Sequence, residues 1–349
     1  MALLEVKELE TAFFTPAGVV KAVNKVSFEL EAGKVLGIVG ESGSGKSVTA
    51  YSILQILTHP GRIVGGSITF GGKQLIGMTE DEMRDIRGNK ISMIFQDPMT
   101  SLTPVYTVGN QLIEAIMLHT KRDKDQAWQR AKEMLELVGL NEPEKRLKQY
   151  PFELSGGMRQ RVMIAMALAC EPDILIADEP TTALDVTMQA QILELMKELQ
   201  HKLGMAIIMI THDLGVIASM CDEVIVMYAG KVAERGSVDQ IFYHPKHEYT
   251  KGLMNSIPNI ENDEKERLIP IAGTPVDMLN LPDGCAFAPR CLKCMKVCLS
   301  RQPAEVLVGD KHLSACWANV QQGMREPNRI VTDENGNIER IEFNGEAGL

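Results

Sequence analysis

Eight residues near the N-terminus have the types and spacing of a loop that binds phosphate. They are Gly40-Glu41-Ser42-Gly43-Ser44-Gly45-Lys46-Ser47, between the apolar run 35–39 and a helix-compatible stretch over 48–57. Glycines let backbone N–H groups turn around a phosphate chain, and the next helix points its positive end at the same anion. Lys46 can reach the β and γ phosphates, and the Ser47 hydroxyl can bind Mg²⁺. These residues predict that the chain binds a nucleoside triphosphate.

Two carboxylates follow the apolar strand predicted over residues 174–177. Asp178 would hold Mg²⁺, directly or through a water, and Glu179 would polarise the water that attacks the phosphate. Such a pair is by itself more often a solvated strand end. The phosphate loop upstream favours the catalytic interpretation.

A second candidate anion site is Ser155-Gly156-Gly157, at the start of a predicted helix. Free N–H groups at a helix start face outward and can bind an anion. Because one chain needs only one phosphate loop, a second site suggests that a triphosphate held by a partner subunit docks here. The alternative is an ordinary helix cap, which Ser155 can form in addition.

The elements that must position these groups alternate between strands and helices, which predicts an α/β fold with a parallel sheet. Residues 2–35 alternate apolar and polar positions, as antiparallel strands do. Short strands are expected over 65–72, 91–95, 174–177 and 206–210, and helices over 125–138, 157–169 and 187–203. The helical stretch between Gln96 and Ser155 is long enough to be a subdomain.

Composition limits the class of protein. At 349 residues the chain is long enough for about two domains. A net charge of −10 argues against a general nucleic-acid binder. No apolar run approaches the roughly 18 residues that span a bilayer, and no signal peptide is apparent. We therefore expect a protein on the cytosolic side.

The seven cysteines fall into two groups. Cys170 and Cys221 lie in apolar segments and are expected as buried small hydrophobes. The other five crowd between residues 285 and 316. In a cytosolic chain such crowding suggests a metal site rather than disulfides.

The order of these motifs resembles that of ATP-binding cassette (ABC) proteins. The sequence Leu154-Ser155-Gly156-Gly157, before a strand that ends in Asp-Glu, is similar to the signature of that family. The resemblance implies a P-loop NTPase of the α/β class with a RecA-like core, an antiparallel β subdomain and a helical subdomain at about residues 100–165. It also implies ATP, Mg²⁺ and ATPase activity.

The same resemblance gives roles to further residues. Gln96 resembles the glutamine that touches Mg²⁺ and senses the membrane subunit, and His212 resembles the switch histidine that contacts the γ-phosphate. Ala183-Leu184-Asp185 resembles the D-loop. Phe13 is placed like the aromatic residue that stacks on adenine, although the adjacent Phe14 leaves open which ring does so.

Residues 4 to about 317 resemble, more closely, the ATPases of oligopeptide and dipeptide importers. The similarity lies in segments 91–99, 155–168, 176–186 and 244–250, where Glu248 departs from the usual proline. Residues 97–104 stand where the family engages a coupling helix of the membrane subunit. We therefore expect a nucleotide-binding domain over 1–257, an extension over 258–324, and a tail over 325–349 with a hairpin at Asn335-Gly336.

In some members of that family, cysteines spaced as Cys285, Cys291, Cys298 and Cys316 bind a 4Fe–4S cluster. Four thiolates suit an iron–sulfur cluster or a structural zinc site. Cys294 is extra, and zinc or no metal are the alternatives. A structural role, pinning a tail poor in apolar residues, is favoured over electron transfer.

The resemblance also implies partners. They are a second related ATPase in a heterodimer or a homodimer, two membrane permeases, and an external peptide-binding protein, with this chain peripheral on the cytoplasmic side. The cargo is not readable from these residues, and nickel remains open. A soluble ABC ATPase of DNA repair or translation is the alternative of another class, but such proteins carry coiled-coil insertions, basic surfaces or two cassettes, which are not visible here.

Overall fold

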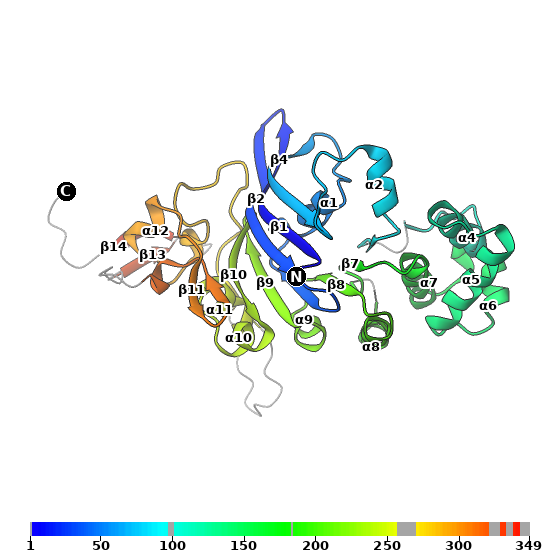
Figure 1. Ribbon diagram of the computed structural model, residues 1–349. Helices are drawn as coiled ribbons and strands as arrows, with labels where there is room; N and C mark the ends of the chain where they lie inside the picture. The colour runs from blue at the N-terminus through cyan, green and yellow to red at the C-terminus, as the bar shows by residue number, and fades with distance from the viewer. Residues whose placement is uncertain are drawn as a thin grey trace, which may run out of the picture.

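The computed structural model describes residues 2–96, 101–182, 184–256 and 270–320, and the backbone of two strands over 329–332 and 338–342. The chain begins with an antiparallel sheet in the order β2-β1-β4-β5 (Figure 1). Its strands are β1 (Leu4–Thr15), β2 (Gly18–Leu30), β4 (Gly61–Phe70) and β5 (Lys73–Gln74). The antiparallel strands predicted over 2–35 are therefore confirmed.

The main sheet has eight strands in the order β11-β12-β10-β9-β3-β8-β7-β6. Its parallel part is made of β3 (Val35–Val39), β6 (Ile91–Ile94), β7 (Ile174–Asp178), β8 (Ala206–Ile210) and β9 (Glu223–Tyr228). Every residue of β3, β7 and β8 is buried, which explains why these strands are continuous apolar runs. The predicted α/β fold with a parallel sheet is confirmed.

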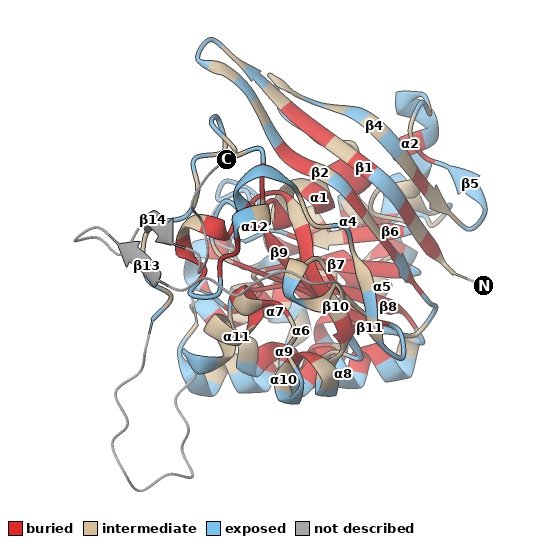
Figure 2. Ribbon diagram, turned by 90° about the vertical axis from the view of Figure 1, so that its left-hand side faces the viewer, coloured by how far each residue is buried: buried red, intermediate tan, exposed pale blue. Residues whose placement is uncertain are grey.

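Alternate residues of these strands pack into two cores, one on each face of the sheet. Ile176 and Ile208 pack with the antiparallel sheet and with α1 (Lys46–Ile53). Leu175 and Ile207 pack on the opposite face. Figure 2 shows the buried residues concentrated in the strands. The sheet is therefore held rigidly from both sides, because successive side chains of a strand point to opposite faces.

Helices cover the second face and extend beyond it. They include α8 (Val186–Leu203), α9 (Leu214–Met220), α10 (Val238–Tyr243) and α11 (Glu248–Asn255). A separate group contains α4 (Val108–His119), α5 (Lys124–Leu137), α6 (Pro143–Lys148), the 3₁₀ turn η1 (Pro151–Glu153) and α7 (Gly156–Leu168). This group lies on the right in Figure 1, away from the C-terminal elements. The short helix α2 (Glu80–Ile86) follows the first sheet.

Side-chain caps begin several of these helices. Thr107, Asp123 and Ser155 each accept a hydrogen bond from a backbone N–H in the first turn of α4, α5 and α7. Such caps satisfy groups that the helix itself cannot pair. Within the part of the chain that the structure describes, no helix has the length and apolar character needed to cross a membrane.

The C-terminal residues add two strands to the main sheet, and this was not predicted. β10 (Lys231–Ser237) pairs antiparallel with β12 (His312–Ser314), which pairs with β11 (Val306–Gly309). In the sequence, η2 (Ala288–Arg290) and α12 (Lys296–Ser300) precede β11, and η3 (Trp317–Asn319) follows β12. β13 (Arg329–Thr332) and β14 (Ile338–Glu342) pair antiparallel, while Asn335-Gly336 lies outside the described residues.

A buried carboxylate holds this junction together. Glu234 of β10 is fully buried and lies 2.7 Å from Nε2 of His312 on β12. It also accepts hydrogen bonds from the backbone N–H groups of Lys246 and His247, at 2.7 and 2.8 Å. One side chain therefore joins the sheet, the added strand and the turn before α11.

His247 is buried beside this junction and caps α11. Its Nδ1 accepts a hydrogen bond of 3.0 Å from the backbone N–H of Tyr249. Burial lowers the pKa of His247 from 6.5 to about 4, although Glu234 and Glu248 oppose the shift. Below pH 6.5 the unfolded chain therefore binds a proton that the folded chain does not bind.

We predict that His247 lowers the free energy of unfolding by up to about 3 kcal/mol as the pH falls from about 6.5 to about 4. In the variant His247→Asn, which keeps a capping oxygen but does not titrate, stability should depend less steeply on pH in this window. Denaturant unfolding at several pH values measures the slope. The exposed His201→Asn serves as the control, and equal slopes for His247→Asn and the parent chain would contradict the prediction.

Candidate nucleotide-binding and catalytic site

The loop Gly40–Ser47 joins the end of β3 to the start of α1, as its sequence predicts. Gly40 and Gly45 have φ angles of 154° and 101°. A Cβ at Gly40 would lie 2.2 Å from the Met227 carbonyl oxygen, and one at Gly45 would lie 2.3 Å from the Ala22 carbonyl oxygen. The turn therefore needs glycine at both positions, both for the backbone conformation and for space.

The Lys46 ammonium group lies inside this loop. Its Nζ donates hydrogen bonds to the carbonyl oxygens of Gly40 (2.8 Å) and Glu41 (3.0 Å). Burial lowers the pKa of Lys46, while the carboxylates of Glu179 and Asp178 act in the opposite direction. Phosphate oxygens could replace these carbonyl oxygens as acceptors without moving the lysine far.

Asp178, at the end of β7, has the arrangement expected of a cation ligand. Its Oδ1 accepts a hydrogen bond of 3.0 Å from Ser47 Oγ. Its Oδ2 is buried and accepts no hydrogen bond of normal geometry from the described residues, although the Tyr51 hydroxyl is near. Burial raises the pKa of Asp178. A buried carboxylate oxygen without a partner is costly, so these residues fit a Mg²⁺ ion.

Glu179 contacts two side chains from distant parts of the sequence and one close neighbour. Its Oε2 accepts hydrogen bonds from Gln96 Nε2 (2.9 Å) and Thr182 Oγ1 (2.9 Å), and its Oε1 lies 3.1 Å from His212 Nδ1. The predicted residues Gln96, Glu179 and His212 are therefore brought together. Thr182 is not among the predicted residues, and only its position three residues after Glu179 could have indicated it.

The surroundings of Glu179 favour the ionised form of its carboxylate. Burial acts to raise its pKa, but the hydrogen bonds from His212 and Thr182, together with the charges of His212 and Lys46, hold the pKa below its ordinary value. Its backbone has a φ of 49°, which is rare outside glycine, and its N–H donates to the Ile210 carbonyl oxygen at 2.8 Å. Strained backbone of this kind concentrates at functional sites.

Ser155 and Gly156 are exposed at the start of α7. Ser155 Oγ accepts a hydrogen bond of 3.4 Å from the Met158 N–H, so the capping interpretation is correct. A Cβ at Gly157 would lie 2.0 Å from Met188 Cε, whereas a Cβ at Gly156 would meet no atom within 4 Å. A side chain at Gly157 would therefore require the Met188 methyl group to move, and one at Gly156 would displace nothing.

Three further predictions have different outcomes. The Phe13 ring lies against Gly61 and is half-buried, while the guanidinium of Arg62 covers the Phe14 ring at 3.9 Å from its centroid. Neither contact tests adenine stacking. Ala183 of the predicted D-loop and residues 97–100 of the predicted coupling segment lie outside the described residues.

The tail cysteines do not support the predicted metal site. Among the described residues, no three His, Cys, Asp or Glu side chains form a group that could hold a metal ion. The 4Fe–4S cluster expected at Cys285, Cys291, Cys298 and Cys316 is therefore not supported, nor is the zinc alternative. All seven cysteines are free thiols.

Burial explains why most of these thiols are neutral. It raises the pKa of Cys285 to about 11 and that of Cys291 to about 12, with nearby thiols adding to both shifts. A hydrogen bond from Cys294 lowers the pKa of Cys298 to about 7 and raises that of Cys294. Since metals bind thiolates, a metal at these cysteines would have to displace their protons.

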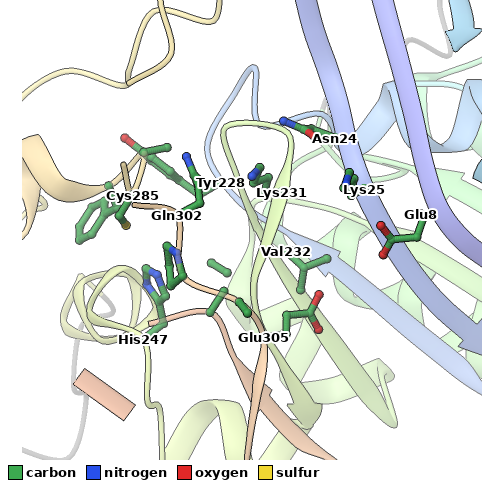
Figure 3. Close-up of a pocket in the computed structure, with 16 residues that line it drawn as sticks. Glu8, Asn24, Lys25, Tyr228, Lys231, Val232, His247, Cys285, Gln302 and Glu305 are labelled. Atoms are coloured by element: carbon green, nitrogen blue, oxygen red, sulfur yellow. The ribbon is translucent and has the colours of Figure 1, made fainter. Parts of the chain in front are cut away.

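A cavity of about 340 Å³ lies at the junction with the C-terminal residues, and Figure 3 shows its lining. Glu8, Asn24 and Lys25 approach from one side, and Cys285 and Gln302 from another. No residue of the loop Gly40–Ser47 lines it. The cavity is therefore separate from the nucleotide site.

Two family models match the sequence. The model described as ABC transporter matches residues 23–182, and the one described as oligopeptide/dipeptide transporter, C-terminal region, matches residues 233–298. The oligopeptide transport ATP-binding protein OppD of Bacillus subtilis is 54% identical over 90% of this chain and 88% of its own length. The OppD protein of Escherichia coli is 52% identical over 92% of this chain and 94% of its own length.

Solved structures show the same fold. A dimeric post-hydrolysis state of the ATP-binding cassette MJ0796, bound to ADP and Pi, is 27% identical with a TM-score of 0.61, over 67% of this chain and 98% of that one. The cbiO1 protein of Clostridium perfringens is 29% identical with a TM-score of 0.60, over 70% of this chain and 91% of that one.

We predict that Glu179→Gln leaves ATP binding intact and lowers the rate of hydrolysis by about a hundredfold or more, because the amide cannot accept a proton from the attacking water. Phosphate release and equilibrium nucleotide binding measure the two effects. Glu194→Gln, an exposed position on α8, serves as the control. Persistent turnover in Glu179→Gln would show that another group is the general base.

Proposed function

We propose that this chain, which belongs to the ABC transporter family and within it to the oligopeptide and dipeptide transport ATP-binding proteins, couples ATP hydrolysis to peptide uptake. The observation that carries the proposal is the convergence of Gln96 and His212 on Glu179, beside Lys46 and Asp178. The groups come from four connections of the parallel sheet, with Asp178 and Glu179 sharing one, and together they provide what phosphoryl transfer to water requires.

We assign roles to these groups as follows. Lys46 and the N–H groups of the loop bind the phosphates of ATP. Ser47, Asp178 and Gln96 hold Mg²⁺, which neutralises phosphate charge when it is bound. Glu179 accepts the proton of the attacking water, and His212 contacts the γ-phosphate.

In the structure, these groups contact one another. Gln96 Nε2 and His212 Nδ1 are both engaged by Glu179, and Lys46 by loop carbonyl groups. Hydrolysis requires Glu179 to face a water and His212 to face the phosphate. We therefore propose that ATP binding exchanges these internal contacts for contacts to the nucleotide, which keeps the resting site inactive.

The second half of each site would come from a partner ATPase. Ser155 and Gly156 are exposed, and no hydrogen bond or ion pair among the described residues joins them to the loop Gly40–Ser47. MJ0796, a cassette of this fold, was solved as a dimer. We propose a head-to-tail pair, as a heterodimer or a homodimer, in which the signature residues 155–157 cover the partner's ATP.

The relatives are named as ATP-binding proteins of oligopeptide transport, and the remaining partners are proposed from the resemblance to peptide importers. We propose that the pair of ATPases works on the cytoplasmic side of the membrane with two permeases and an external peptide-binding protein. The net charge of −10 gives no reason to add a nucleic acid.

Peptide uptake tests the proposal directly. In cells that lack the gene, the wild-type chain should restore uptake of labelled di- or oligopeptides, and Glu179→Gln should not. Glu194→Gln is again the control. Restored uptake of nickel, without peptide uptake, would overturn the peptide assignment but leave the ATPase assignment in place.

The split site gives a second prediction. Gly156→Asp should leave the fold and the ATP affinity of the isolated chain unchanged, since the position is open and an acid suits the first turn of a helix. It should lower hydrolysis by the assembled transporter by about tenfold or more, because the new carboxylate would repel the partner's phosphates. Gly156→Ala is the uncharged comparison. Full activity of Gly156→Asp in the assembly would exclude the shared site.

The tail cysteines are left out of this mechanism, because the described thiols do not fit a metal. The spacing of Cys285, Cys291, Cys298 and Cys316 still motivates an assay after anaerobic purification. A 4Fe–4S cluster would bring about four iron and four sulfide ions per chain. A zinc site would bring about one zinc ion, and a chain with neither would present free thiols.

A further inference from the structure

A buried arginine of the C-terminal residues forms an ion pair with the phosphate loop. Arg290 forms a forked ion pair with Glu41, the second residue of that loop, with distances of 2.6 Å (Nη1 to Oε2) and 2.9 Å (Nη2 to Oε1). The Arg290 side chain is only 3% exposed, and that of Glu41 is 25% exposed. The residues are 249 positions apart in the sequence. The contact therefore joins two parts of the chain that are far apart in the sequence.

The arginine is itself held in place. Its Nε donates to the Ala272 carbonyl oxygen at 2.9 Å, and its Nη2 donates to the Ile271 carbonyl oxygen at 3.4 Å. Nη1 also lies 3.4 Å from the Tyr228 hydroxyl. A guanidinium group fixed at each nitrogen and facing one carboxylate in a fork has a defined position.

The loop is held at the same residue from a second direction. The backbone N–H of Glu41 donates to the Tyr249 hydroxyl at 2.9 Å. Tyr249 is fully buried, and its ring packs against Tyr228 and Phe287, with centroids 4.7 and 5.4 Å away. Phe287 is three residues from Arg290 and lies just before the same 3₁₀ turn. One aromatic cluster therefore supports both contacts to Glu41.

Glu41 in turn affects the lysine that binds phosphate. Its carbonyl oxygen accepts a hydrogen bond from Lys46 Nζ, next to that of Gly40. A rotation of the Glu41 peptide would displace one acceptor of the lysine and shift the backbone N–H groups that follow. The position of Glu41 is therefore part of the geometry of the phosphate site.

We propose that Arg290 is a positioning residue for ATP binding: through Glu41 it holds the phosphate loop in its binding conformation, so that docking of the C-terminal residues sets the affinity of the site for ATP. No contact between Arg290 and the nucleotide is required. The proposal concerns ATP binding by this chain and does not depend on which cargo the transporter carries.

The test measures ATP affinity of the full-length chain by competition with a fluorescent nucleotide. Arg290→Lys keeps the charge but cannot form the fork, and Arg290→Met removes both. Each, like Glu41→Gln, should weaken ATP binding by about tenfold. The double variant Arg290→Met with Glu41→Gln should bind no more weakly than the weaker single variant, because both changes act through one contact.

A second ion pair supplies the matched control. Arg235 Nε lies 3.1 Å from Glu305 Oε2, and this pair also joins the main sheet to the C-terminal residues without touching the phosphate loop. Arg235→Met should leave ATP affinity unchanged. Thermal unfolding of every variant establishes that it is folded, and Arg290→Lys decides the outcome if Arg290→Met does not fold.

In the assembled transporter, KM for ATP should rise in Arg290→Lys while kcat at saturating ATP changes less than about twofold. A purely structural role would lower stability without this division between KM and kcat. Wild-type ATP affinity in the folded Arg290 variants would overturn the proposal. An equal loss of affinity in Arg235→Met would also overturn it, because the effect would then reflect general loosening of the C-terminal residues.

Discussion

The site depends on the parallel pairing of four short strands. In register, Val35 of β3 stands beside Ile207 of β8, and Ile174 of β7 stands beside Ala206 of β8 and Ile91 of β6. Because parallel strands end at the same edge of a sheet, the residues that follow them meet there. Those residues are the phosphate loop, Gln96, Asp178 and Glu179, and His212. Burial on both faces fixes this register, so the core determines where the chemical groups lie.

This edge of the sheet brings two carboxylates and a lysine close together, and these charges are complementary to Mg²⁺ and phosphate. Asp178 is fully buried, Glu179 is nearby, and Lys46 is the buried cation among them. Ser47 and Lys46 satisfy part of this charge, and Oδ2 of Asp178 accepts no hydrogen bond from the described residues. Burying an unpaired carboxylate costs free energy, which binding of Mg²⁺ with ATP would recover. The resting chain is therefore complementary to its ligand and only partly satisfied without it.

Short-range patterns in the sequence predict this edge well, for a physical reason. The strands are continuous apolar runs, the loop requires glycines at fixed positions, and the cap Ser155 is a local signal. Each depends on a few neighbouring residues. Contacts between distant residues are not encoded in this way, so the added strands β11 and β12, which pair with β10 from far along the chain, are absent from the predictions. The spacing of the tail cysteines suggested a metal site, but spacing does not reveal how deeply each thiol is buried or where it points.

The C-terminal residues illustrate how much such long-range contacts matter. Their apolar side chains, such as Phe287 and Met295, pack into the core on one face of the main sheet, β12 extends that sheet, and His312 meets the buried carboxylate of Glu234. Strand pairing and the buried contact to Glu234 bind this segment to the main sheet. The pairing also covers β10, which would otherwise be an exposed edge strand. Since β10 is joined through β9 to β3, and β3 leads directly into the phosphate loop, the same sheet that anchors the C-terminal residues also carries the nucleotide site. The same sheet therefore contributes both to the stability of the C-terminal residues and to the geometry of the nucleotide site.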